Sequence, residues 1–264
     1  HSGHRAPPRT WQIQRVSVIR ACLSLSFAGL LVVTSGAVVV ADDVLPERVL
    51  FIGNSHTARH GGLDWAVGNM VATEEPPRTF QGTARTASGV TLEYHYRNGA
   101  TAAILEGGFD AVVLQSYLPG AWPPSTEPFI EYVARLHDVV QASGADTVIF
   151  MTWPQGRRDW ATLDDFVTAH REAEAQLGVP VAPVGVAFEN ARAERPGLEL
   201  IGDDAVHATW EGAYLAAATV YATLFDRSPE GLPYAFGVSD DAAAFLQRIA
   251  WQTISDWRAG IPVA

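Results

Sequence analysis

A serine, a histidine and an aspartate stand in two short motifs that could together perform nucleophilic chemistry. Ser55 lies in "RVLFIGNSHT" (48–57), where an apolar run ends at a glycine before a helix can begin. Asp204 and His207 lie far downstream in "DDAVH". A carboxylate three residues before a histidine can accept one ring N–H, which leaves the other ring nitrogen free to act as a base. The pattern therefore predicts a serine nucleophile, Ser55, with His207 as its base and Asp204 as the residue that orients the base.

Each motif alone also suits an ordinary structural role. Gly-Asn-Ser is common turn and cap chemistry, and Asp-x-x-His before a helix is also a loop or cap feature. Position 57 is Thr, so the Gly-x-Ser-x-Gly elbow of the lipase type of α/β-hydrolase is missing. The hypothesis of a triad depends on elements that would bring the two motifs together.

Several other chemistries are excluded by residue content. All 18 basic residues are Arg, which removes phosphate-loop lysines, Ser-Lys dyads and Schiff-base lysines. The single cysteine, Cys22, lies near the N-terminus, outside the expected domain. His56 and His60 are four residues apart, but no third ligand follows at metal spacing. We expect neither a metal nor a cofactor.

Apolar runs and helical segments alternate along the chain. Five strands are predicted, at 48–53, 79–84, 111–115, 146–152 and 179–185. The clearest helical segments between and after them are 126–142, 162–177, 210–225 and 239–258. This alternation indicates an α/β fold, a three-layer α/β/α sandwich around a five-stranded parallel sheet with flavodoxin-like topology.

The predicted sheet would bring the two motifs to one rim. In open α/β sheets, ligands bind outside the carboxyl ends of the strands. Ser55 follows the first strand, and Asp204 and His207 follow the last one. The polar run "TFQGTA" (79–84) suits an edge strand.

In this order and spacing, the motifs resemble those of the SGNH/GDSL hydrolases over residues 48–225. "IGNSHT" looks like the first block of that family, with Ser55 as nucleophile. "ASGVTL" looks like the second, where Gly89 would give a backbone N–H to the oxyanion hole. "DDAVH" looks like the last, with Asp204 and His207 completing the triad. The resemblance implies the SGNH fold and a serine esterase.

The chain departs from this resemblance at the third block. The family usually supplies an asparagine to the oxyanion hole there, whereas the third strand of this chain ends in "VVLQSY". Gln115 carries the same amide donor and is the candidate replacement, with Ser116 second and a purely structural role for both left open. Losing one oxyanion donor typically costs about a hundred- to a thousandfold in rate, so the change needs compensation.

Other residues are weaker candidates for contact with a substrate. Asn54 adjoins the predicted nucleophile, and His95 follows Gly89, although a partly buried histidine bonded to the backbone is the favoured interpretation of His95. Trp122, Trp153 and Trp160 fall in the loops after strands three and four, where tryptophan can stack on a sugar or pack internally. We expect His137 and His170, in mid-helix, to be on the surface.

Residues 1–41 have the pattern of an export signal. Four arginines and no acidic residue accompany an apolar run of 20 residues, 21–40, that ends at Ala41. We expect cleavage after Ala41 and a single domain over 42–264, secreted or in the cell envelope. A run of this length also meets the requirement for an uncleaved membrane anchor.

Charge and resemblance together define the expected function. With 18 basic residues against 29 acidic ones the surface repels polyanions, so nucleic acid is not expected as a partner. The resemblance implies hydrolysis of short acyl esters, chiefly acetyl esters on carbohydrates. The alternatives are a non-catalytic carbohydrate-binding protein on the same fold, and an acyltransferase or lipase that uses the same residues.

Overall fold

The computed structural model describes residues 45–116, 127–156 and 161–262 of the chain. The expected leader (1–41), Cys22, Trp122 and Trp160 lie outside these residues. Among the described helices, none is long and apolar enough to cross a membrane.

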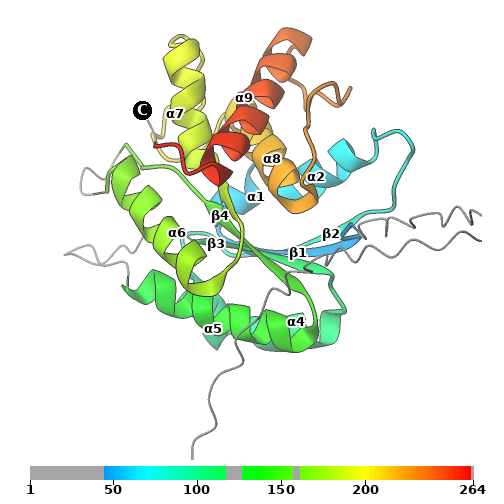
Figure 1. The fold of residues 1–264 in the computed structure, drawn as a ribbon, viewed down its shortest axis with the longest axis vertical. Coiled ribbons are helices and arrows are strands. Elements are labelled where there is room, and N and C mark those ends of the chain that lie inside the picture. Colours follow the sequence, from blue (N-terminus) through cyan, green and yellow to red (C-terminus); the bar gives the residue numbers. More distant parts are fainter. Residues whose placement is uncertain (1–44, 117–126, 157–160, 263–264) are drawn as a thin grey trace, which may run out of the picture. The chain divides into compact units, whose positions relative to one another are not determined.

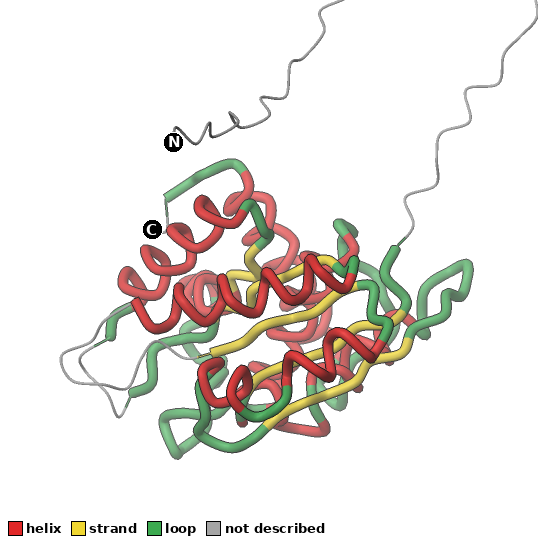
Figure 2. The backbone as a smooth tube through the Cα atoms, turned by 90° about the horizontal axis from the view of Figure 1, so that it is seen from below, coloured by secondary structure: helices red, strands yellow, loops and turns green. Residues whose placement is uncertain are grey.

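One parallel sheet forms the middle layer of the fold (Figure 1 and Figure 2). Its strand order is β2-β1-β3-β4-β5, with every neighbouring pair parallel. The predicted α/β class and flavodoxin-like topology are therefore confirmed. The strands are β1 (Arg48–Gly53), β2 (Gln81–Thr86), β3 (Ala111–Ser116), β4 (Asp146–Met151) and β5 (Val181–Pro183).

The two outer strands differ most from their predicted bounds. β2 begins two residues later than expected, and its largely exposed side chains suit the predicted edge position. β5 is shorter than expected because Val184 already begins a helix. Edge strands carry weaker apolar patterns, so their limits are harder to recognise than those of buried strands.

Alternate side chains of β1 supply the two halves of the core. Val49 and Phe51 point to one face of the sheet, whereas Leu50 and Ile52 point to the other. All four are at most 2% exposed. A strand buried on both faces reads as a continuous apolar run, which is why "RVLFIG" is recognisable from sequence.

Helices cover both faces of the sheet, as Figure 1 shows. The face of Val49 and Phe51 is covered by α1 (Ser55–Ala58), α2 (Leu63–Val71), α7 (Val184–Glu194), α8 (Trp210–Phe225) and α9 (Asp240–Arg258). The other face is covered by α3 (Leu92–Arg97), α4 (Ala100–Gly107), α5 (Glu127–Ser143) and α6 (Leu163–Leu177).

The four long helices lie within one residue of their predicted bounds. Local capping explains part of this agreement. Thr162 and Asp165 form a reciprocal capping box at the start of α6, and Thr209 accepts a hydrogen bond from Gly212 N–H at the start of α8. The shorter helices α2, α3, α4 and α7 have no predicted bounds for comparison.

His170 is buried, so the expectation that it lies on the surface is wrong. Its ring lies between Phe129, with a centroid distance of 4.5 Å, and Phe166 on the same helix. Nδ1 donates to the carbonyl of Phe166 at 2.7 Å. Burial lowers the pKa of His170 to about 4. The neutral ring acts as a core side chain between α5 and α6.

Candidate active site

Ser55 stands at the carboxyl end of β1, as the first residue of α1. Asn54 caps this helix, because its side-chain oxygen accepts from His56 N–H at 3.0 Å and its carbonyl accepts from Thr57 and Ala58 N–H. The cap fixes the turn that follows β1. Ser55 is therefore presented at the helix N-terminus, where the partial positive charge favours an anion.

Close packing requires glycine at position 53, where β1 ends. A Cβ atom at position 53 would lie 2.2 Å from Thr57 Oγ1 and 2.5 Å from Gln115 Oε1. Real atoms do not approach so closely, so any side chain here would displace the first turn of α1 or the Gln115 amide. Glycine thus allows the end of β3 to support the turn that carries Ser55.

The base is held by a tightly closed loop, residues 201–208. Ile201 and Ala208 form an antiparallel bridge, and Gly202 N–H donates to the His207 carbonyl at 2.9 Å. Within the loop, Ala205 has a φ of 57°, a left-handed conformation that is unfavourable for alanine. The chain accepts this strain where it turns between Asp204 and His207.

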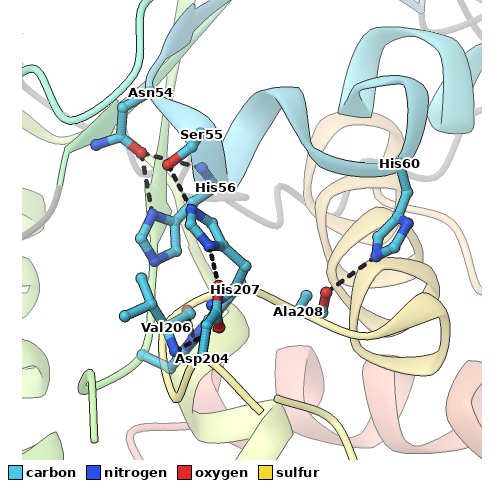
Figure 3. A network of polar contacts seen from close by, with 9 residues as sticks. Asn54, Ser55, His56, His60, Asp204, Val206, His207 and Ala208 are labelled. Carbon is cyan, nitrogen blue, oxygen red and sulfur yellow. Dashed lines mark hydrogen bonds and ion pairs between the residues drawn. The ribbon is translucent and has the colours of Figure 1, made fainter. Parts of the chain in front are cut away.

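The three residues of the predicted triad meet at hydrogen-bond distance (Figure 3). His207 Nδ1 donates to Asp204 Oδ2 at 2.5 Å, and Ser55 Oγ–H donates to His207 Nε2 at 2.8 Å. The carboxylate therefore sets the tautomer that leaves Nε2 as acceptor toward the serine. This is the arrangement of nucleophile, base and orienting group that activates a serine.

Backbone N–H groups of the same loop also fix the Asp204 carboxylate. Its Oδ1 accepts from the N–H groups of Val206 and His207, both at 2.9 Å. The hydrogen bond from the His207 ring and these two N–H groups hold the pKa of Asp204 far below its usual range. The side chain therefore remains a carboxylate, and protonation does not remove the group that orients His207.

His56 and Trp153 pack beside the histidine of the triad. The His56 ring lies 4.9 Å from Trp153, edge to face, and 5.7 Å from His207. Its Nδ1 donates to Asn54 Oδ1 at 3.0 Å. Burial, followed by the nearby charge of His207, lowers the pKa of His56 to about 4. A neutral ring therefore adjoins the base at neutral pH.

Trp153 is 2% exposed, so the interpretation that it stacks on a sugar is wrong. Its ring stacks on Phe188 of α7 at 4.4 Å, and its N–H donates to the Val206 carbonyl at 3.0 Å. The residue thus supports the loop that carries His207. Trp122, the other tryptophan of the weak substrate set, lies outside the described residues.

Gln115 connects the end of β3 to the turn of the nucleophile. Its Oε1 accepts from Asn54 N–H and from Thr57 Oγ1–H, both at 2.8 Å. Both bonds use the oxygen, so the amide orientation is fixed and Nε2 is the remaining donor. That nitrogen is buried without a hydrogen-bond partner among the described residues. Such an atom calls for a functional explanation.

The segment of the predicted second block is tied to the same turn. Asn54 Nδ2 donates to the Val90 carbonyl at 3.1 Å, next to Gly89, whose φ of 69° suits glycine. Asn54 is itself 1% exposed and uses both side-chain polar atoms in these contacts. In this structure it positions its neighbours and has no exposed surface to offer a substrate.

The remaining weak candidates are buried. His95 is 2% exposed and its Nε2 bonds the Gly53 carbonyl at 2.7 Å, which is the backbone-bonded alternative. Ser116 is also buried, at the end of β3. His60 does not share a helix face with His56, because the chain kinks at His60, where φ is 53°. Its Nε2 instead donates to the Ala208 carbonyl at 3.0 Å.

The packing of His56 beside His207 was not predicted from the sequence, where its spacing to His60 raised only the question of a metal site. The sequence feature that could have indicated this packing is the position of His56 directly after Ser55, in the first turn of a helix. A buried side chain there must face the elements that surround the nucleophile. Its partners, however, come from β4 and the 201–208 loop, which no local pattern identifies.

Comparison with known proteins supports the same fold. Neither a protein-family model nor a curated protein matches the chain. Among solved structures, a putative SGNH hydrolase from Slackia heliotrinireducens is similar, with 27% identity and a TM-score of 0.57. The match covers 67% of this chain and 98% of that one.

Two more distant structures share the fold. A DUF4886 family protein from Bacteroides uniformis is 18% identical, with a TM-score of 0.58 over 83% of this chain and 97% of that one. An acetyl-xylooligosaccharide esterase from Geobacillus is 15% identical, with a TM-score of 0.56 over 73% of this chain and 97% of that one. The fold and the likeness to the Slackia protein support the assignment of this chain to the SGNH hydrolases.

Proposed function

We propose that the protein is a serine esterase that hydrolyses short acyl esters, chiefly acetyl esters, on carbohydrates. One observation carries the proposal: the continuous chain of hydrogen bonds from Ser55 Oγ to His207 and on to Asp204, at 2.8 and 2.5 Å. A structural cap or turn explains neither the closeness of two distant motifs nor the tautomer that their contacts impose.

The reaction follows from this chain of bonds. His207 Nε2 takes the hydroxyl proton of Ser55, and Oγ attacks the ester carbonyl to form a tetrahedral adduct. The adduct collapses as His207 returns the proton to the leaving alcohol, which leaves an acyl group on Ser55. Water, deprotonated by His207, then attacks the acyl-enzyme, and the acid departs as Ser55 recovers its proton.

Three N–H donors are proposed for the oxyanion hole. Ser55 N–H belongs to the first turn of α1, where the helix N-terminus favours negative charge. Gly89 N–H comes from the segment that Asn54 holds, and Gln115 Nε2 takes the place of the missing asparagine. The buried amide nitrogen, whose oxygen is already committed to two bonds, supports this role for Gln115.

The substrate class rests on resemblance and charge. Two similar structures are described as an acetyl-xylooligosaccharide esterase and an acetyl xylan esterase. The formal net charge of −11 disfavours anionic substrates. The pattern of residues 1–41 supports action outside the cytoplasm, where such polymers occur.

The test is hydrolysis of p-nitrophenyl acetate, butyrate and octanoate by the full chain and by Ser55→Ala. Removing the nucleophile of a triad costs on the order of 10⁶ in kcat, so the turnover of the variant should fall to background. Ser255→Ala, which removes an exposed hydroxyl from α9, is the matched control and should retain full activity.

The alternatives separate in the same experiment. Equal background rates from both proteins would contradict the esterase and favour a binding protein. Turnover that depends on Ser55 but gives an acylated sugar instead of free acid, when an acceptor sugar is present, would identify an acyltransferase. Preference for octanoate over acetate would identify a lipase.

A further inference from the structure

Two half-exposed tryptophans pack against Phe236, and one of them, Trp210, follows His207 by three residues. Trp65 is in the first turn of α2 and Trp210 begins α8, and each is 49% exposed. Single exposed apolar residues are normal, but grouped ones mark a surface that binds something. We call these two indoles and the rings that support them the tryptophan shelf.

The shelf rests on one turn of the chain. The His60 ring lies against Trp210 at a centroid distance of 4.1 Å. The next residue, Gly61, lies under Trp65, where a Cβ atom would come within 3.1 Å of the indole. Phe236 is buried between the two indoles, 5.2 Å from Trp210 and 5.4 Å from Trp65. Phe236 is thus a shared partner of both indoles, and the adjacent residues His60 and Gly61 each support one of them.

The supporting residues hold unfavourable backbone conformations. His60 and Phe236 have φ values of 53° and 55°, in the left-handed region that bulky residues avoid. Such conformations persist only where the surroundings fix them. The shelf is therefore a rigid, preorganised apolar surface, which lowers the entropic cost of binding a ligand.

The shelf is also joined to the triad. His60 Nε2 donates to the carbonyl of Ala208, the residue after His207 (Figure 3). Trp210 follows His207 by three residues, and three residues of chain span at most about 11 Å. One short oligosaccharide can therefore contact Trp210 while an ester on it reaches Ser55.

We propose that Trp65 and Trp210 form a subsite for an uncharged pyranose ring of the acylated substrate, an inference that rests on the proposed function. The C–H face of a pyranose packs flat on an indole, while its hydroxyls remain in water. Glu211, partly exposed beside Trp210, offers an acceptor for such hydroxyls. The acidic surface disfavours anionic sugars.

The test compares sugar esters with an ester that has no sugar. The substrates are acetylated xylo-, manno- and cellotetraose and p-nitrophenyl acetate, each with the full chain, Trp65→Leu and Trp210→Leu. Leucine keeps apolar bulk but removes the flat ring. We expect KM for the preferred tetrasaccharide to rise about tenfold in each variant, with kcat changed much less. The preference for that sugar over p-nitrophenyl acetate should fall by the same factor.

Two further variants separate binding from folding. Trp210→Phe keeps a ring face and should recover most of the lost preference. Leu105→Ala removes a comparably exposed side chain from α4, which covers the opposite face of the sheet. This variant should leave KM and kcat unchanged for both kinds of substrate. Binding of the acetylated tetrasaccharides to Ser55→Ala by calorimetry should weaken with Trp210→Leu in that background.

The outcomes distinguish this inference from the proposed function. Turnover of p-nitrophenyl acetate that depends on Ser55, with sugar preference unchanged in both tryptophan variants, would overturn the subsite and leave the esterase. The subsite would also be overturned, and the esterase kept, if none of the three acetylated tetrasaccharides is a substrate. The same conclusion would follow if the tryptophan variants lose turnover of p-nitrophenyl octanoate instead. Absence of Ser55-dependent turnover on every ester would overturn the esterase, and the subsite with it.

Discussion

The base loop (201–208) and the proposed oxyanion side of the site are built in opposite ways. In the base loop the decisive contacts join near neighbours, because Asp204 bonds His207 three residues away. On the oxyanion side they join distant segments, because Asn54 N–H bonds Gln115 61 residues away and Asn54 Nδ2 bonds Val90 36 residues away. One half of the site is thus formed by residues close in sequence, whereas the other is formed by distant segments that the sheet brings together.

This difference predicts how each half responds to change. A local loop can keep its shape when one side chain loses its function, since its backbone bonds and the Ile201–Ala208 bridge remain. The oxyanion side depends more on side chains, because Asn54 and Gln115 bridge β1, β3 and the 89–90 segment. Substitutions there should disturb geometry and chemistry together.

The largest effect in this comparison is expected for Asp204→Asn. An amide has one acceptor oxygen, so it cannot serve the two backbone N–H groups and also hold His207 in the tautomer that Ser55 needs. We expect kcat for p-nitrophenyl acetate to fall by about 10⁴, as for the equivalent change in a serine protease triad, with the thermal unfolding midpoint little altered.

Asp203→Asn is the matched control, because this exposed neighbour lies in the same loop. Its activity should equal that of the unchanged protein. A rate for Asp204→Asn within tenfold of the unchanged protein would remove this carboxylate from the triad. Loss of the folded state would show that the loop is less self-contained than its hydrogen bonds indicate.

The second-largest decrease in kcat is expected for Gln115→Leu, on the proposed oxyanion side of the site. The change removes the buried Nε2 donor and also the oxygen that holds Asn54 and Thr57. Loss of one oxyanion donor costs about 10² to 10³ in kcat, and we expect a decrease in that range. Steady-state kinetics on p-nitrophenyl acetate measure it, with KM expected to change much less than kcat.

Thr57→Val separates the two roles of Gln115. It removes the hydroxyl that donates to Gln115 Oε1 while leaving Nε2 in place. A decrease of no more than about tenfold is expected if the nitrogen is the active group, since a typical hydrogen bond contributes about 1 kcal/mol. Equal losses from the two variants would instead give Gln115 a structural role and leave the oxyanion hole without its amide.

The sequence was most informative where a function depends on local spacing or on a strongly apolar run. The apolar run of β1 predicted where Ser55 would stand, and the spacing of Asp204 and His207 predicted their bond. Parallel topology then implied that the two motifs meet at one rim. These steps need only the direction of each strand and the reach of a side chain.

Side-chain burial on the rim could not be predicted in the same way. Trp153 follows β4 as expected, but it turns inward because Phe188 of α7 offers a flat partner and Val206 accepts its N–H. His170 turns inward between Phe129 and Phe166 for a similar reason. In both cases the partner lies partly or wholly on another element, so periodicity along one segment does not reveal it.

The smallest effect is expected for His56→Phe, which tests the contact between the two halves. Phenylalanine keeps a ring against Trp153 but loses the N–H that holds Asn54 Oδ1. Because Asn54 keeps its bond to Val90 and still caps α1, we expect kcat/KM to fall only about tenfold. His137→Phe, remote from the site, is the control and should not change this value.

The pH profile of the same variant shows whether His56 shares the proton chemistry of the base. Burial and the charge of His207 lower the pKa of His56 to about 4, so its ring is neutral from about pH 5 upward. Above that pH a single protonation should then limit kcat/KM on the acid side, with a slope of one in both proteins. A slope of two that becomes one in His56→Phe would show that His56 titrates with the base. In that case the two halves of the site would be coupled by charge as well as by packing.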